Sequence, residues 1–405
     1  MLYTLRMIVL FILCGIGIGL AIIGDVIWSI VGWRLRRTLR SGLSVRSHLE
    51  DPIEEELVTI VVPAHNEERI ISRCAEALMS QRWSKLEIIF VADRCTDGTV
   101  DLLRRTVDGD ERVRIIENNS CPDSWAGKCN AARLGAAGAS GRYLIFMDAD
   151  TIADPDLIRA AVTSAKARGA SLLSLLTKLT MKAVYERRTQ TAASMLLLTL
   201  YPPERVNRDE ASRPFANGQF MLFEREWYEK IGGHEAVRDD LLEDIAFARC
   251  IDEHGGRVNL LSADGLLECS MYSSSAAFRR GWQRIFIEAC RRKPARMRQW
   301  ATRLRLLGLF IPSAILMACI VGIVTLAMGS FWWGLTTILV SVIALFVQAI
   351  VLAAIYRSFH QPPISIWRFP MGCEDLARIL CEGARVLEQG KPVLWGGREY
   401  ILEPR

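Results

Sequence analysis

The sequence lacks the patterns that mark zinc-binding, disulfide-linked and nucleic-acid-binding proteins. Its eleven cysteines include no pair in C-x-x-C spacing and its five histidines are scattered, which favours a reduced compartment and predicts no zinc site. The 50 basic and 45 acidic residues leave a net charge of only +5, so no nucleic-acid-binding tail is indicated. No G-x-G-x-x-G or G-x-x-x-x-G-K-[ST] segment follows a strand-like run, which argues against the usual dinucleotide and P-loop sites.

Apolar residues make up 51% of the chain, and they concentrate in three long runs. Residues 7–24, 306–328 and 331–356 contain no charged side chain. About 20 apolar residues cross the core of a bilayer, so each run is long enough to span, although the last two could form a re-entrant hairpin. The first run is too long for a signal peptide and has no cleavage site, so we expect an anchor. Within it, Gly15 and Gly19 have the small-xxx-small spacing typical of helix packing.

Basic residues indicate how these spans are oriented, because cytoplasmic flanks are enriched in Lys and Arg. The flanking basic residues are Arg6 before the first span, Arg34, Arg36, Arg37 and Arg40 after it, Arg291, Arg292, Lys293, Arg296, Arg298, Arg303 and Arg305 before the second, and Arg357 after the third. We therefore expect a multi-pass protein of the inner (cytoplasmic) membrane. Its N-terminus would lie outside, and residues 34–305 and the C-terminal tail would lie in the cytosol.

Beyond residue 57 the pattern changes to short apolar runs that alternate with amphipathic stretches. Strands buried on both faces are expected at residues 57–63, 86–93, 112–117 and 142–148. Helices are expected at residues 67–81, with Asn66 as the N-cap, at 97–107 and at 126–139. Alternation of this kind predicts a mostly parallel sheet with helices on both faces, in which ligands bind beyond the carboxyl ends of the strands.

Acidic residues follow three of the predicted strands: Glu67 comes after the first, Asp93 ends the second and Asp148-Ala-Asp150 follows the fourth. Asp148 and Asp150 are two residues apart, so in extended backbone they project to the same side. Two hard oxygen donors on one side suit Mg²⁺ or Mn²⁺ bridging to phosphate oxygens. The alternative is a solvated turn in which Asp150 caps a helix.

A second acidic pair, Glu243 and Asp244, directly precedes an apolar helical stretch. Carboxylates are favoured at a helix N-terminus by the helix dipole, so capping is one explanation of the pair. Catalysis is the other.

The motifs in combination resemble those of the membrane-bound family 2 glycosyltransferases, which have the GT-A fold. In chain order they are Ile60-Val-Val-Pro-Ala-His-Asn-Glu67, Val91-Ala-Asp-Arg-Cys-Thr-Asp-Gly-Thr99, Trp125-Ala-Gly-Lys128, Phe146-Met-Asp-Ala-Asp150, Ala216-Asn-Gly-Gln219, Gly232-Gly-His-Glu235, Leu242-Glu-Asp244 and Met271-Tyr272. The match covers roughly residues 55–285. One anchor, a cytosolic domain and a membrane hairpin together look most like the enzymes associated with hopanoid and carotenoid glycosylation.

The resemblance implies donor-binding roles for five residues. Ala64 and Glu67 match the loop that holds the nucleotide of the sugar donor, and Asp93 matches the acid that contacts its base. Lys128 matches a position near the nucleotide and its phosphates, and Asp148 matches the carboxylate beside the donor sugar.

Four further residues have roles in catalysis or on the acceptor side by the same resemblance. Asp150 matches the main metal ligand, which implies Mg²⁺ or Mn²⁺ as cofactor, and Asp244 matches the general base. Glu243 and Trp282 match positions that the family has on the acceptor side.

The reaction implied is inverting transfer of a sugar from a nucleotide-sugar, expected to be a UDP-sugar, to a hydroxyl of a membrane lipid. A hopanoid, a carotenoid or another isoprenoid or sphingolipid-like molecule would be the acceptor, and no nucleic acid is involved. Processive relatives carry Q-x-x-R-W where this chain has Arg280-Gly-Trp-Gln-Arg284, so one sugar per acceptor is expected. The alternatives are a processive polysaccharide synthase and an inactive membrane scaffold, and the presence of Asp150 and Asp244 argues against the scaffold.

We therefore expect an α/β chain, with a GT-A (Rossmann-like, mostly parallel sheet) cytosolic domain plus three transmembrane helices. The expected segments are an N-terminal transmembrane anchor (1–33), a basic linker (34–56), the GT-A domain (57–285), a basic juxtamembrane segment (286–305), a transmembrane hairpin (306–356) and a cytosolic amphipathic tail (357–405).

Three short segments leave questions open. The apolar run at residues 195–201 is either a core helix or an interfacial element that feeds an acceptor to the site. From Glu374 onward, apolar residues at helical spacing predict an amphipathic helix that docks on the domain or lies on the membrane. No function follows from Trp395-Gly-Gly-Arg-Glu-Tyr400.

Overall fold

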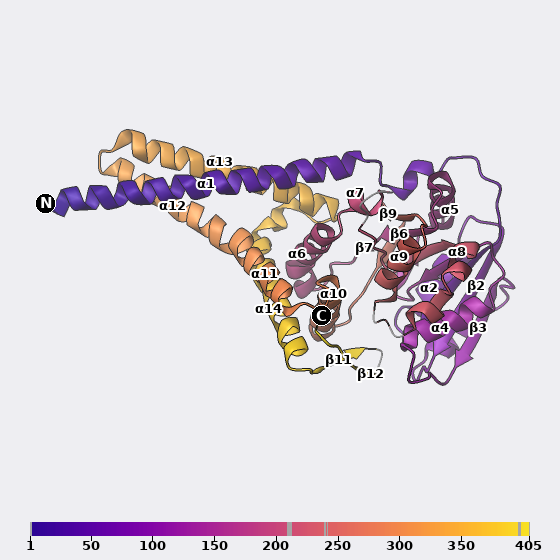
Figure 1. Cartoon of the computed structure of the whole chain (residues 1–405). Coiled ribbons are helices and arrows are strands. Elements are labelled where there is room, and N and C mark those ends of the chain that lie inside the picture. The colour runs from indigo at the N-terminus through magenta and orange to yellow at the C-terminus, as the bar shows by residue number, and fades with distance from the viewer. Residues whose placement is uncertain (1, 209–212, 239, 241, 396–397, 405) are drawn as a thin grey trace.

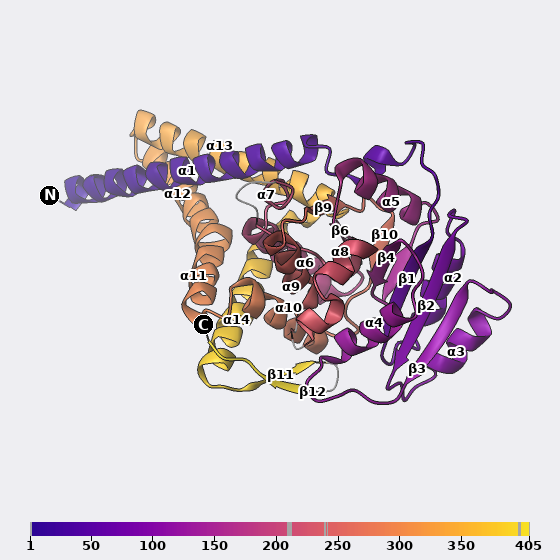
Figure 2. The same cartoon turned by 45° about the vertical axis from the view of Figure 1, so that its right-hand side comes forward.

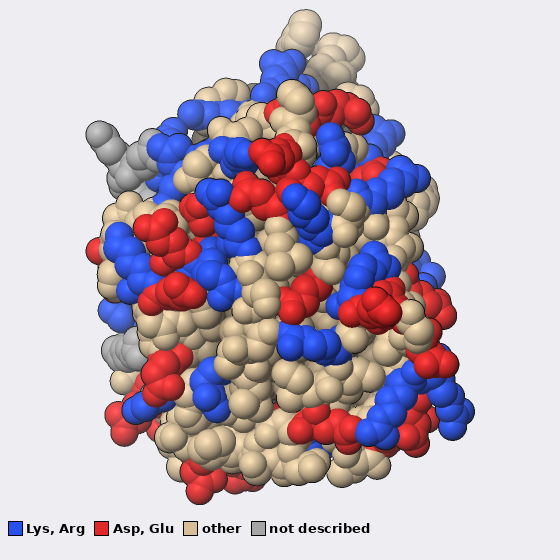
Figure 3. All heavy atoms as spheres, turned by 90° about the vertical axis from the view of Figure 1, so that its right-hand side faces the viewer, with Lys and Arg blue, Asp and Glu red and all other residues tan. Residues whose placement is uncertain are grey.

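The computed structural model describes residues 2–208, 213–238, 240, 242–395 and 398–404 of the chain. Three long apolar helices form one end of the molecule and an α/β domain forms the other (Figure 1). They are α1 (Leu2–Arg40), α12 (Ile311–Ala327) and α13 (Phe331–Ser358), which pack against one another. The end farthest from them carries interspersed acidic and basic side chains, as expected for a surface that faces water (Figure 3).

All three apolar helices are long enough to cross a membrane. The candidate spans are Thr4–Arg40, Pro294–Ala327 and Phe331–Ser358, the second of which joins α11 (Pro294–Arg305), η3 (Leu306–Phe310) and α12 without a break. At a rise of 1.5 Å per residue, α13 is about 42 Å long, against about 30 Å for a bilayer core. The sequence prediction of three helices of spanning length and composition is confirmed.

The predicted helix-packing glycines were the wrong pair. No atom lies within 4 Å of the Cβ position of Gly15 or Gly19, so these residues face away from the other two helices. The close approaches are instead at Gly17, whose Cβ would lie 2.4 Å from that of Ala318, and at Gly32, whose Cβ would lie 2.8 Å from Val351. A helix of 3.6 residues per turn places positions two residues apart on different faces, and the spacing rule did not identify which face packs.

The α/β domain is built on a seven-stranded sheet in which β8 alone runs antiparallel to its neighbours. The strands in spatial order are β3 (Val113–Asn118), β2 (Leu86–Asp93), β1 (Val58–Ala64), β4 (Tyr143–Met147), β8 (Phe220–Glu224), β6 (Leu172–Leu176) and β9 (Val258–Ser262). A smaller sheet contains β5 (Thr151–Ala153), β10 (Leu267–Cys269) and β7 (Lys178–Leu179). The predicted strands are confirmed, with ends that shift by no more than one residue, and so is the mostly parallel sheet.

The helices of this domain follow the predicted alternation. They are α2 (Ile71–Met79), α3 (Thr99–Thr106), α4 (Gly127–Ala137), α5 (Leu157–Arg168), α8 (Arg225–Lys230) and α9 (Glu243–Glu253), with short turns at η1 (Val45–His48), α7 (Pro203–Val206) and η2 (Gly233–Val237). The N-cap prediction for Asn66 is wrong, because α2 begins five residues later at Ile71. Asn66 has a φ of 59°, and its side chain accepts a hydrogen bond from the backbone of Thr96, which ties together the loops after β1 and β2.

A helical layer lies between the apolar helices and the sheet (Figures 1 and 2). It contains α6 (Val184–Leu200), α10 (Ser275–Ala289), α11 and α14 (Phe369–Glu388), with η4 (Pro363–Arg368) leading into it. The tail helix α14 buries Leu376, Leu380, Gly383 and Leu387 and contacts α6, α10 and α11. Of the two alternatives for the tail, the structure therefore supports docking on the domain.

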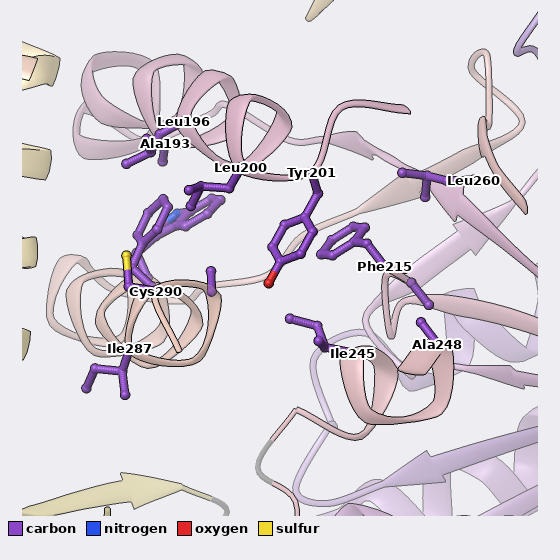
Figure 4. Close-up of a cluster of buried hydrophobic side chains, with 14 of the residues drawn as sticks. Ala193, Leu196, Leu200, Tyr201, Phe215, Ile245, Ala248, Leu260, Ile287 and Cys290 are labelled. Carbon is purple, nitrogen blue, oxygen red and sulfur yellow. The ribbon is translucent and has the colours of Figure 1, made fainter. Parts of the chain in front are cut away.

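The apolar run at residues 195–201 belongs mainly to the core. Leu196, Leu200 and Tyr201 are buried, and Tyr201 stacks on Phe215 with ring centroids 4.6 Å apart. Figure 4 shows Tyr201 directed between the end of α10, where Cys290 follows the helix, and α9. The run thus joins the helical layer to the sheet domain.

Candidate active site

The predicted site residues come from the carboxyl ends of three parallel strands and from the first turn of α9. Ala64 is the last residue of β1 and is buried, Asp93 is the last of β2, and Asp148 follows β4. Glu243 is the first residue of α9. Because parallel strands present their carboxyl ends at one edge, segments far apart in the sequence meet there.

Lys128, near the start of α4, joins two parts of this site. Its Nζ lies 2.7 Å from Oδ1 of Asp148 and 2.6 Å from Oε1 of Glu243. Burial alone would lower the pKa of Lys128, but the charges of Asp148 and Glu243 hold it well above its ordinary value. The lysine that was predicted near the donor phosphates is therefore a charged link between the strand-end carboxylates and α9.

Asp244 is held by two backbone N–H groups. Its Oδ2 accepts a hydrogen bond of 2.7 Å from Gly218 and its Oδ1 one of 2.7 Å from Ile245. Burial and the neighbouring charge of Glu243 raise its pKa to about 7. A general base works best when its pKa is near the working pH, so this carboxylate is suited to take a proton at neutral pH.

Negative charge accumulates around Asp150. Burial and the charge of Asp148 raise the pKa of Asp150 to about 7, and burial with the charges of Asp150 and Asp148 raises that of Glu67 to about 7. Oδ1 of Asp150 accepts a weak hydrogen bond of 3.3 Å from the thiol of Cys269. Surplus carboxylate charge of this kind fits a divalent cation.

No three His, Cys, Asp or Glu side chains of the described residues are placed to hold an ion by themselves. An ion at Asp150 would therefore share its coordination with another molecule. The phosphate oxygens of a donor are hard ligands of the right kind.

Asp93 is fixed on both sides of its carboxylate. Its Oδ1 accepts a 2.6 Å hydrogen bond from Asn118 at the end of β3, and its Oδ2 accepts two from Arg94, at 3.0 and 2.7 Å. The imidazole Nδ1 of His65 lies 2.6 Å from the backbone oxygen of Asp93. The site thus has a second acidic position at its β2–β3 edge, separate from the cluster around Lys128.

Trp282 does not lie at the surface. It is 2% exposed, stacks on Phe286 with centroids 5.4 Å apart, and its Nε1 donates a 3.4 Å hydrogen bond to Oε1 of Gln190 on α6. The side chain therefore packs α10 against α6, and its expected position beside the acceptor remains a prediction.

Two residues that the sequence analysis did not assign belong to the site. Gly218 lets the backbone approach Asp244 and Lys128, because a Cβ there would lie 3.1 Å from Oδ2 of Asp244 and 3.2 Å from Nζ of Lys128. Arg284 of α10 is only 9% exposed and lies within electrostatic range of Glu243, Asp244 and Asp148.

The sequence gives a signal for Gly218 as a site residue but not for Arg284. Gly218 lies in a recognised motif, whereas nothing in the sequence distinguishes Arg284 from the exposed Arg279 and Arg280 on the same helix.

Comparisons with known proteins find similarity to glycosyltransferases. Residues 59–232 match the model of the family described as Glycosyl transferase family 2. The chain is 36% identical over 107 residues to an uncharacterized glycosyltransferase of Haemophilus influenzae, covering 26% of this chain and 32% of that protein. It is 35% identical over 95 residues to the UDP-Glc:alpha-D-GlcNAc-diphosphoundecaprenol beta-1,3-glucosyltransferase WfaP of Escherichia coli, covering 24% of this chain and 36% of that protein.

The matched segments thus span about a third of the length of these relatives. Among solved structures, a likeness extends over 93% of this chain and 99% of the mannosyltransferase PcManGT of Pyrobaculum calidifontis, whose structure contains GDP-Man and Mn²⁺. The TM-score of that comparison is 0.49 and the identity 20%. The similarity to family 2 glycosyltransferases thus lies in residues 59–232, and the sheet has the mostly parallel, Rossmann-like topology of the GT-A fold.

Proposed function

We propose that the chain transfers one sugar, with inversion, from a nucleotide-sugar donor to a hydroxyl group of a membrane lipid. A UDP-sugar is the expected donor, and a hopanoid, carotenoid or other isoprenoid or sphingolipid-like lipid is the expected acceptor. The observation that carries the proposal is Asp244, a buried carboxylate with a pKa of about 7, connected through Glu243 and Lys128 to the acidic strand ends.

In the proposed reaction Asp244 takes the proton of the acceptor hydroxyl. The electron pair of that oxygen forms a bond to the anomeric carbon of the donor, and the bond from this carbon to the diphosphate oxygen breaks. The nucleoside diphosphate leaves with that electron pair. General-base assistance of this kind contributes about 10²–10⁴-fold to the rate.

The remaining charged residues would position the donor. Asp150, with Asp148 and Glu67 near it, would hold Mg²⁺ or Mn²⁺, which when bound neutralises charge on the diphosphate. Lys128 keeps Asp148 oriented through the 2.7 Å ion pair, and Arg284 contributes a second buried positive charge on the acceptor side. Ala64 and Asp93 would border the nucleoside.

A lipid acceptor is supported by the arrangement of the helical layer. The helices α6, α10 and α14 lie between the site and the three apolar helices, so an acceptor held in a bilayer would be close to α9 and α10 (Figure 2). The relative WfaP is named for a diphosphoundecaprenol acceptor. The basic flanks of the apolar helices support a cytosolic site in an inner membrane.

The direct test is sugar transfer by the purified full-length protein in lipid nanodiscs, with a panel of labelled UDP- and GDP-sugars, Mg²⁺ or Mn²⁺, and total membrane lipid. Label that moves with the lipid fraction supports the proposal and names the donor. Label in long polymers would favour a processive synthase, and absence of transfer from every donor would contradict the proposal.

A further inference from the structure

The C-terminal end of the chain forms a small hairpin beside the donor edge of the site. Strands β11 (Pro392–Trp395) and β12 (Arg398–Ile401) pair in antiparallel register, with Val393 opposite Tyr400. Figures 1 and 2, which view the molecule from two directions, both place this hairpin next to α4 and the loop that leads into it. The chain thus returns from α14 to the carboxyl ends of β2 and β3.

The hairpin is anchored by buried side chains. Val393 and Leu402 are 7% and 6% exposed, and both belong to the large hydrophobic cluster that runs through the helical layer and one face of the sheet. Tyr400 is half-buried and packs against the same cluster. Anchoring on both strands gives Tyr400 a defined position.

Arg94 connects the hairpin with Asp93. Its guanidinium donates two hydrogen bonds to Oδ2 of Asp93 and passes close over the start of α4, where a Cβ on Gly127 would lie 2.3 Å from Nη2. The hydrogen bond to Asp93 is the main cause that raises the pKa of Arg94, and the nearby phenol of Tyr400 adds to it. Tyr400 therefore lies within electrostatic range of Arg94, which hydrogen-bonds to Asp93.

Arg94 also adopts an unusual backbone conformation, with a φ of 50°. A non-glycine residue at positive φ is uncommon, and it occurs most often where the surrounding structure requires a particular side-chain direction. Here the guanidinium is brought to Asp93 and to the start of α4.

We propose that the β11–β12 hairpin completes the donor-nucleotide site, with the Tyr400 ring packing on the nucleobase that Asp93 contacts and Arg94 holding the Asp93 carboxylate in place. This rests on the proposed function, because it assumes that the donor nucleoside lies at the Asp93 edge. An aromatic face is suited to stacking on a planar base, and its phenol offers a polar group toward the ribose. The tail that follows the membrane-side helices thereby contributes directly to donor affinity.

The test is equilibrium binding of UDP and GDP to the full-length protein in nanodiscs, measured by calorimetry with Mg²⁺ present. We expect Tyr400→Ala to raise the Kd of the preferred nucleotide at least 10-fold, and Tyr400→Phe to keep it within about threefold because the ring is retained. Leu394→Ala, which removes an exposed side chain of β11, is the matched control and should leave the Kd unchanged. Thermal unfolding of each variant shows that the fold is intact.

The outcomes separate the two proposals. Wild-type protein that binds UDP or GDP, with Tyr400→Ala binding equally well, overturns the hairpin proposal and leaves the glycosyltransferase proposal standing. Wild-type protein that binds neither nucleotide contradicts the proposed function itself. Equal loss of affinity in Leu394→Ala and Tyr400→Ala would show that the hairpin acts only through stability, which also overturns the assignment of Tyr400.

Discussion

Asp244 is positioned by the backbone, and its chemistry can be removed without disturbing that position. Replacement by Asn keeps the shape but leaves a group that takes no proton at neutral pH. We expect Asp244→Asn to lower the transfer rate by about 10²–10⁴-fold while the Kd for UDP stays within about twofold, because the base acts on the acceptor. Initial rates and nucleotide binding measured on the same preparation check this, and normal transfer by the variant would contradict the assignment.

The same carboxylate predicts the pH dependence of the reaction. Burial and the charge of Glu243 raise the pKa of Asp244 to about 7, and only its ionised form can accept a proton. The rate should therefore rise with pH up to about 7, be nearly level above it, and fall about tenfold for each unit below about pH 6. A profile of kcat/KM for the lipid acceptor, with donor saturating, is the measurement, and a rate that is constant from pH 5 to 8 would exclude Asp244 as the base.

Gly218 controls the distance between the base and Lys128. A methyl group at this position would lie 3.1 Å from Oδ2 of Asp244 and 3.2 Å from Nζ of Lys128, closer than ordinary contacts. We expect Gly218→Ala to lower kcat about 10-fold or more with little change in thermal stability, since a small displacement of a catalytic group has large effects. Gly19→Ala is a suitable control because no atom lies within 4 Å of its Cβ position. Wild-type kcat in Gly218→Ala would show that the close approach is not needed.

At the level of elements, the helical layer depends on a close contact between α14 and α6. A Cβ on Gly372 would lie 2.2 Å from the backbone oxygen of Arg188, so an added methyl group must push the two helices apart. We expect Gly372→Ala to destabilise the protein by about 1–3 kcal/mol, the usual cost of overpacking. Thermal unfolding in detergent measures this, with Met371→Ala, an exposed side chain on the same helix, as the control. Equal unfolding temperatures for the two variants would show that α14 adjusts without cost.

The helical layer also explains why two apolar segments, in α6 and α14, both pack inside the protein. The apolar run in α6 and the amphipathic tail helix α14 both contain enough apolar residues to lie on a membrane, yet each buries its apolar residues against the other and against α10. Burial of roughly 25 cal/mol per Å² of apolar surface favours this packing wherever a partner surface is available. The composition of the two segments did not show which surface each of them would pack against.

For the whole molecule, the proposed orientation can be tested with reporter fusions. By the excess of Lys and Arg on cytoplasmic flanks, the basic residues that flank α1, α12 and α13 predict a C-terminus in the cytosol and a turn at Gly329–Ser330 outside. We expect a C-terminal green fluorescent protein to fluoresce and a C-terminal alkaline phosphatase to be inactive in a bacterial host. Alkaline phosphatase inserted at Gly329 should be active, and the reverse pattern would invert the topology.

The sequence by itself determined the features that depend on neighbouring residues. Alternation of apolar runs predicted the strands β1 to β4 to within one residue, and uncharged runs predicted the three apolar helices, because hydrophobic periodicity and length are local properties. The acidic residues at strand ends were predicted correctly as members of one edge, since parallel strands share a direction.

Only the tertiary structure decided which distant groups meet. Lys128 joins Asp148 to Glu243, Arg284 is buried while Arg279 and Arg280 are exposed, and Asn66 bonds to the next loop instead of capping α2. Each of these contacts depends on how helices and loops pack against the sheet. Side chains of the same type at similar spacing in the sequence do not indicate which of them will make such a contact. Local pattern thus identified the elements and the acidic edge, while long-range packing assigned the partner of each charge.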